Sequence, residues 1–95
     1  MGKRLVERRL RQVSARLRRL RDELRVIDDQ LAQLSDDAGD MEIRALVAET
    51  PGAGHDYRQA QAHADAMAAH RAHVVESINE LERRQDQLLD ELTAR

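Results

Sequence analysis

Residues 6–34, VERRLRQVSARLRRLRDELRVIDDQLAQL, place apolar side chains at alternating intervals of four and three residues. These side chains are Val6, Leu10, Val13, Leu17, Leu20, Leu24, Ile27, Leu31 and Leu34. The spacing is the a and d pattern of the heptad repeat, which keeps one apolar stripe facing a partner helix. The stretch therefore predicts a coiled-coil helix over residues 4–35. Gly39 is the expected stop, because glycine adopts the left-handed C-terminal conformation without strain.

A short middle helix is expected next, over residues 41–49. Asp40 can cap its start, and the pattern makes Leu46 and Val47 its expected buried side. The helix must end before Pro51, because a residue that precedes a proline is pushed toward extended geometry. The Pro-Gly-Ala-Gly stretch that follows is typical of a turn.

A last helix is expected over residues 56–93. Asp56, with Gln59 three positions later, indicates a capping box at its start. Its heptad positions form two rows: Ala60, Met67, Val74, Leu81 and Leu88 on one, and Tyr57, Ala64, Arg71, Ile78, Gln85 and Leu92 on the other. Val75 and Leu89 widen the apolar stripe, which favours more than one helical neighbour.

Charge indicates the direction in which the helices pair. Parallel pairing of the first helix with itself would place Arg16 beside Arg21 and Glu23 beside Asp28, and both pairs repel. The last helix of the same chain is then the antiparallel partner. The sequence thus predicts an all-α fold in one domain over residues 1–95. It is an antiparallel helical hairpin with a short middle helix that dimerises into a four-helix arrangement.

Composition narrows the function classes. The 95 residues contain no Cys, Trp or Phe, so a disulfide framework and thiolate metal sites are excluded. We find neither an apolar run of about 18 residues nor a secretory signal pattern, and we expect a cytoplasmic protein without membrane contact. Only one of the sixteen basic residues is lysine, a skew that indicates a GC-rich bacterial genome.

Histidines and nucleophiles give no pattern of a catalytic or metal site. His70 and His73 are neighbours on a helix, but His63 lies about 10 Å away along the axis, too far to share an ion with them. Two histidines without an adjacent carboxylate make a weak site. We therefore expect surface histidines and a non-enzymatic protein with no metal and no cofactor.

Basic and acidic residues are separated along the chain, with ten basic and three acidic residues in 1–25 and one basic and eight acidic residues in 26–56. Four arginines share one outer heptad position and form an arginine stripe: Arg4, Arg11, Arg18 and Arg25. Such a row can grip phosphates, which predicts salt-dependent binding of nucleic acid. The alternative is a solvated face that pairs with acidic residues of the last helix, namely Glu76, Glu80, Glu82 and Asp86.

Four acidic residues gather where the hairpin is expected to turn: Asp36, Asp37, Asp40 and Glu42. Helix capping and loop solubility explain aspartates at such places. The segment Gly39-Asp40-Met41-Glu42 also resembles the Gly-Asp-x-x-Glu tip of Gre-type transcript-cleavage factors, with a spacing one residue short. That resemblance implies a hairpin that enters the polymerase channel, where tip carboxylates help to hold Mg²⁺. Those families also carry a second globular or zinc-binding domain, which is not seen in this sequence.

A second resemblance is to the all-helical chorismate mutases, through the pattern Leu20-Arg21-x-x-Leu24-x-x-Ile27-Asp28 and its continuation to Leu34. It implies an intertwined helical dimer in which Arg21 matches an active-site arginine. The further arginine expected after Leu34 is Ala38 in this chain, and the required downstream lysine is missing because the only lysine is Lys3. A dicarboxylate substrate would then lack its charge clamps.

The function expected from these patterns is that of a non-enzymatic coiled-coil adaptor or regulator that acts through helix-to-helix contacts. Its expected partners are a second copy of the chain and an unknown protein. The alternative is a regulator that binds nucleic acid or RNA polymerase through the arginine stripe or the acidic turn residues.

Overall fold

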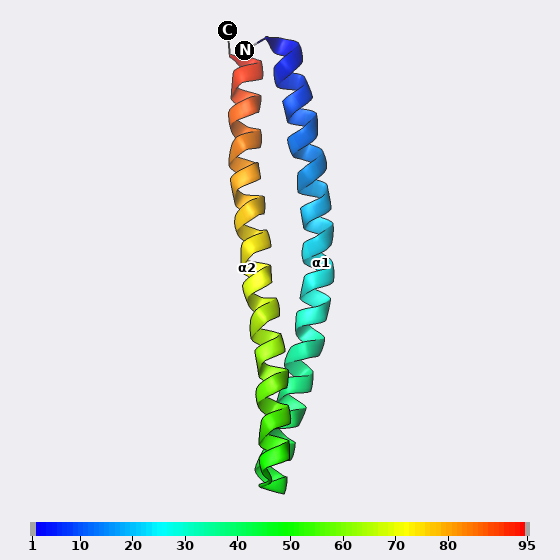
Figure 1. Ribbon diagram of the computed structural model, residues 1–95. Helices are drawn as coiled ribbons and strands as arrows, with labels where there is room; N and C mark the ends of the chain where they lie inside the picture. Colours follow the sequence, from blue (N-terminus) through cyan, green and yellow to red (C-terminus); the bar gives the residue numbers. More distant parts are fainter. Residues whose placement is uncertain (1, 95) are drawn as a thin grey trace. The chain divides into compact units, whose positions relative to one another are not determined.

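The computed structural model of the chain describes residues 2–94, which form two long helices (Figure 1). Helix α1 runs from Lys3 to Ala48 and helix α2 from Pro51 to Thr93. The described residues contain no strand, so the prediction of an all-helical fold with two long helices is confirmed.

The chain divides into two compact units, each of which pairs a segment of α1 with a segment of α2. Unit 1 contains residues 1–24 and 73–95, and unit 2 contains residues 25–72. Within unit 1, Ser14 contacts Gln85 and Arg21 contacts Glu82. Later residues of α1 thus contact earlier residues of α2. The two segments of this unit therefore run antiparallel.

Large aliphatic side chains from both helices form the core of unit 1. Leu17 and Leu88 are fully buried, with an exposed fraction of 0%. Four further heptad residues are buried with them, namely Val6, Leu20, Val74 and Ile78. Full burial of a leucine side chain stabilises a fold by about 1.5–3 kcal/mol, so these buried residues contribute to the stability of the unit.

Small side chains dominate the buried core of unit 2. Ile27, Ala38 and Ala64 are buried, whereas Leu34 and Met67 are only half-buried. An alanine core lets two helix backbones approach closely, but it removes little apolar surface from water. Larger apolar side chains in this unit therefore remain partly accessible.

The prediction that the first helix ends at Gly39 and that a short middle helix follows is wrong. Helix α1 continues through Gly39, and no glycine among the described residues has a positive φ. The heptad spacing explains the continuation, since Ala38, Met41 and Ala45 extend the four-and-three pattern beyond Leu34 and are buried or half-buried. A glycine inside a helix costs about 1 kcal/mol, which continued packing of the helix offsets.

The connection between the helices is shorter than predicted. It contains Glu49, which takes a left-handed φ of 52°, and Thr50, whose Oγ accepts a hydrogen bond from the backbone N–H of Ala53 (3.3 Å). Thr50 is thus the N-cap of α2, and Pro51 occupies the first helical position, where its missing N–H costs nothing. The predicted turn at residues 51–54 and the predicted capping box at residue 56 are both wrong, because both lie inside α2.

Replacing Gly39 with alanine tests the continuous helix. No atom lies within 4 Å of the position that the new Cβ would take. We expect Gly39→Ala to raise the stability by about 0.5–1 kcal/mol, because alanine is the better helix former. The reverse change at an exposed position of the same helix, Ala32→Gly, should lower the stability by a similar amount. A thermal melt followed by circular dichroism measures the stability of each variant. If Gly39 had a left-handed conformation, the alanine variant would be less stable than the wild type.

Candidate functional site

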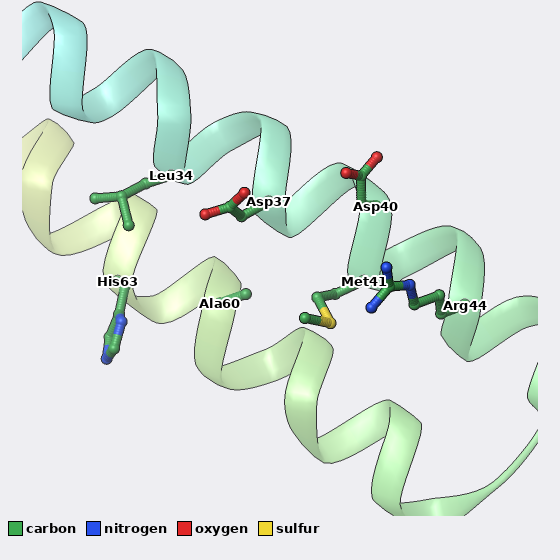
Figure 2. Close-up of a pocket in the computed structure, with 7 residues that line it drawn as sticks. All are labelled: Leu34, Asp37, Asp40, Met41, Arg44, Ala60 and His63. Carbon is green, nitrogen blue, oxygen red and sulfur yellow. The ribbon is translucent and has the colours of Figure 1, made fainter.

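A groove runs along unit 2 between α1 and α2. Its first hollow, of about 250 Å³, is lined by seven residues drawn in Figure 2: Leu34, Asp37, Asp40, Met41, Arg44, Ala60 and His63. The side chains of Leu34, Asp37 and Met41 point toward α2, whereas the carboxylate of Asp40 points away from it. Gln33 donates a hydrogen bond to Asp37 (3.0 Å), which holds this carboxylate beside the groove.

Two further hollows, of about 430 and 310 Å³, continue from the first and also border Leu34. The larger is lined by Leu34, His63, Ala66, Met67 and His70, and the other by Gln30, Gln33, Leu34 and Met67. We call the three hollows together the unit 2 groove. Its centre is apolar because Leu34 and Met67 line it together with the small side chains of Ala60 and Ala66.

Three exposed apolar side chains form a second feature of unit 2, which we call the turn-end cluster. Ile43, Leu46 and Val47 lie on the last two turns of α1 and are 61%, 71% and 81% exposed. Residues three and four apart share a helix face, so these three side chains form one patch. The prediction that Leu46 and Val47 are buried is wrong, because the continued heptad turns Ala45 inward instead.

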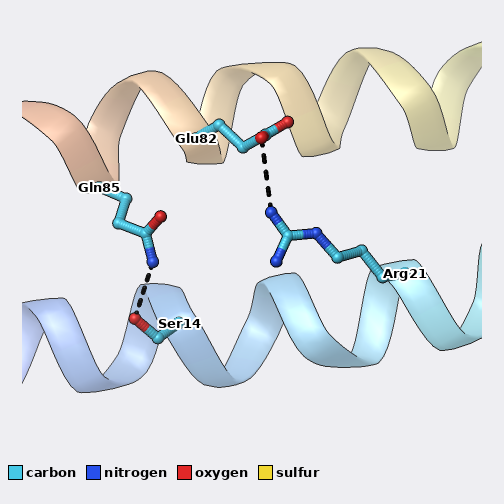
Figure 3. A network of polar contacts seen from close by, with 4 residues as sticks. All are labelled: Ser14, Arg21, Glu82 and Gln85. Carbon is cyan, nitrogen blue, oxygen red and sulfur yellow. Dashed lines mark hydrogen bonds and ion pairs between the residues drawn. The ribbon is translucent and has the colours of Figure 1, made fainter.

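Polar contacts fix the register of the paired helices. In unit 1 the side chain of Gln85 donates a hydrogen bond to Ser14 Oγ (3.0 Å), and Arg21 forms an ion pair with Glu82 (3.4 Å), as Figure 3 shows. Gln85 occupies a heptad position, and a polar heptad residue with one matching partner favours a single register. The ion pair is half-exposed and contributes about 0–1 kcal/mol.

Unit 2 has a comparable pair at its own polar heptad position. Arg71 donates from Nε to Asp28, and the two side chains are 42% and 48% exposed. The hydrogen bond to Asp28, and then its negative charge, raise the pKa of Arg71 above the ordinary value. Arg71 therefore stays charged throughout the pH range in which proteins are studied, and the pair acts as a fixed register contact.

The arginine stripe is divided between the two units. Arg4, Arg11 and Arg18 are exposed on the α1 segment of unit 1, and none of them makes a hydrogen bond or ion pair with another described residue. Arg25 belongs to unit 2 and does take part in a polar or electrostatic interaction. The expected pairing of the stripe with Glu82 is not seen, because Glu82 contacts Arg21.

The four acidic candidates lie within α1 rather than at the turn. Asp37 and Asp40 line the unit 2 groove, whereas Asp36 and Glu42 are exposed and line none of its hollows. The segment that resembles a Gre-type tip is helical, and the chain turns at Glu49 and Thr50, about 10 Å beyond the end of that segment. The structure therefore places Asp37 and Asp40 along α1 beside the groove and not at the turn between the helices.

All four histidines are exposed, and two of them, His63 and His70, line the groove. Within residues 2–94, no three His, Asp or Glu side chains are arranged so that they could hold a metal ion. In the same part of the chain, neither helix has a stretch long and apolar enough to cross a bilayer.

Comparison of the chain with protein-family profiles, curated proteins and solved structures gives no match. The physical features of the two units are therefore the basis for any functional assignment.

Sequence reasoning identified Asp37 and Asp40 but missed the groove beside them. The signal for it was the bulky Leu34, Met41 and Met67 set against a run of alanines in the last helix.

Proposed function

We propose that the protein is a non-enzymatic adaptor or regulator that acts through helix-to-helix contacts, and that it pairs with a second copy of itself. The turn-end cluster carries the proposal. Ile43, Leu46 and Val47 expose large apolar side chains on one helix face, and contiguous exposed apolar surface is typical of sites where proteins bind one another. The three residues occupy the i, i+3 and i+4 positions with which one helix packs on another.

Affinity capture from the native cell extract tests the adaptor function. The wild-type chain should retain a set of proteins that the Ile43→Gln, Leu46→Gln, Val47→Gln triple variant loses. Nuclease treatment should leave that set unchanged, because the contact is between helices. The triple variant should stay folded, since these side chains are exposed. Equal capture by both chains, or loss of the captured proteins after nuclease treatment, would contradict the proposal.

Nucleic-acid binding is the second candidate function, and the exposed arginine stripe favours it. Arg4, Arg11 and Arg18 are available to phosphate because no other described residue pairs with them. The α1 segment of unit 1 holds nine basic and three acidic residues, and a row of arginines can bind phosphates in a salt-dependent way. The chain has no Trp or Phe on which bases could stack, and its net charge is −2, so the helix-contact function is preferred.

Nucleic-acid binding through the arginine stripe separates the two candidate functions, because each predicts a different affinity. For the adaptor we expect only weak binding of duplex DNA or RNA, which disappears between about 50 and 200 mM salt. Replacing Arg4, Arg11, Arg18 and Arg25 with Gln should remove that residual binding and leave the fold intact, because exposed charges contribute about 0–1 kcal/mol each. Fluorescence anisotropy with labelled duplexes measures the effect. Micromolar or tighter binding at about 150 mM salt that the four changes abolish would favour the second candidate.

A further inference from the structure

We infer that the unit 2 groove is a docking site for an amphipathic helix with basic residues on its flanks. This inference rests on the proposed helix-contact function but concerns a different surface from the turn-end cluster. The shape of the groove, its apolar centre and the charge around it lead to this partner.

The shape of the groove fits one helix. Its lining positions on α1 extend from Gln30 to Arg44, about 21 Å of helix, and those on α2 extend from Ala60 to His70, about 15 Å. A helix of about four turns would fill this length. The hollows lie beside the paired helices, where a third helix packs in helical bundles.

The apolar centre fits large aliphatic side chains. Leu34 and Met67 are half-buried, so a docked side chain would complete the removal of their surface from water. Ala60 and Ala66 leave room between these larger residues. Methionine has an unbranched, flexible side chain, and grooves that contain it adapt to helices that present leucine-type residues at i, i+3 or i+4, and i+7.

Charge selects a basic partner. Residues 25–72 hold four basic and nine acidic residues, a balance of −5 with the histidines uncharged. Asp37 and Asp40 line the groove itself, and the other ionisable residues that line it are Arg44, His63 and His70. A helix with Lys or Arg beside its apolar stripe would meet favourable charge at Asp37 and Asp40, whereas one with Glu would meet repulsion.

Two synthetic peptides of about 18 residues provide the probes. Both carry leucines at the same heptad positions, one with Lys and Arg on the flanks and the other with Glu. We expect the basic peptide to bind the full chain at least about tenfold more tightly than the acidic peptide at about 50 mM salt, as measured by fluorescence anisotropy.

Two groove variants, each with a control outside the groove, test whether the basic peptide binds there. Asp37→Asn with Asp40→Asn should weaken binding of the basic peptide about three- to tenfold. Asp29→Asn with Asp36→Asn makes the same charge change on the same helix outside the groove lining and should have a smaller effect. Ala66→Glu should weaken binding at least about tenfold by filling the groove, whereas Ala69→Glu, at an exposed position that lines no hollow, should not.

Equal affinity for both peptides, or equal effects of the groove variants and their controls, would overturn the inference. If neither peptide binds and Ala66→Glu instead abolishes self-association, a second copy occupies the groove and the inference is also overturned. If the wild-type chain still captures proteins through the turn-end cluster, the proposed function stands after either result. The two proposals can therefore fail separately.

Discussion

Replacing Leu17 with aspartate is expected to unfold unit 1. The side chain is fully buried, so the new carboxylate would be removed from water. An unpaired buried charge costs several kcal/mol, a large fraction of the roughly 5–15 kcal/mol by which folded proteins are stable. We expect loss of the cooperative thermal transition, or a fall in its midpoint of more than about 15 °C, by circular dichroism.

Val26→Asp is the control for this change. It also places an aspartate at an apolar position of α1, but at a side chain that is 55% exposed instead of 0% and lies outside the turn-end cluster. Exposed substitutions usually change stability by less than about 0.5 kcal/mol, so the midpoint should move by only a few degrees. Similar melting of the two variants would show that the heptad stripe is not the packing surface of α1.

Truncation of Leu88 is expected to have the second-largest effect on stability. This residue is the fully buried counterpart of Leu17 on α2. Leucine-to-alanine changes in a core cost about 2–5 kcal/mol, because apolar contacts are lost and a cavity remains. Unfolding by urea should therefore shift to a markedly lower midpoint, with little change in slope.

Leu89→Ala provides the comparison at the adjacent position. Leu89 is 42% exposed, so its truncation removes less buried surface and should cost less than about 1 kcal/mol. Both variants should be measured at two protein concentrations, because a contact of Leu89 with a second copy would make its effect depend on concentration. If truncating Leu89 lowered the stability more than truncating Leu88, the face of α2 that packs against α1 would be wrongly assigned.

Periodicity predicted the packing faces of both helices because a heptad stripe repeats over many turns. Leu17, Ile78 and Leu88 are buried at their expected heptad positions, and even the polar Arg71 and Gln85 contact the opposite helix. A pattern repeated this often outweighs any single residue that breaks it.

The ends of the helices were predicted poorly, because those predictions depended on single residues. Gly39 is a typical stop signal, yet Ala38 continues the apolar stripe past it, and packing offsets the cost of the glycine. Pro51 marks the first helical turn of α2 and not a loop, because Thr50 caps it. The groove was missed although the alanines of the last helix signalled it, because its shape depends on how closely those alanines let the two backbones approach.

Sedimentation equilibrium of the full chain at tens of micromolar tests the central claim most directly. The account predicts a two-copy species for the wild type and a monomer for the Ile43→Gln, Leu46→Gln, Val47→Gln variant, with unchanged helicity. A wild-type chain that remains strictly monomeric, or a variant that dimerises as well as the wild type, would contradict the claim that exposed apolar helix surface brings two copies together.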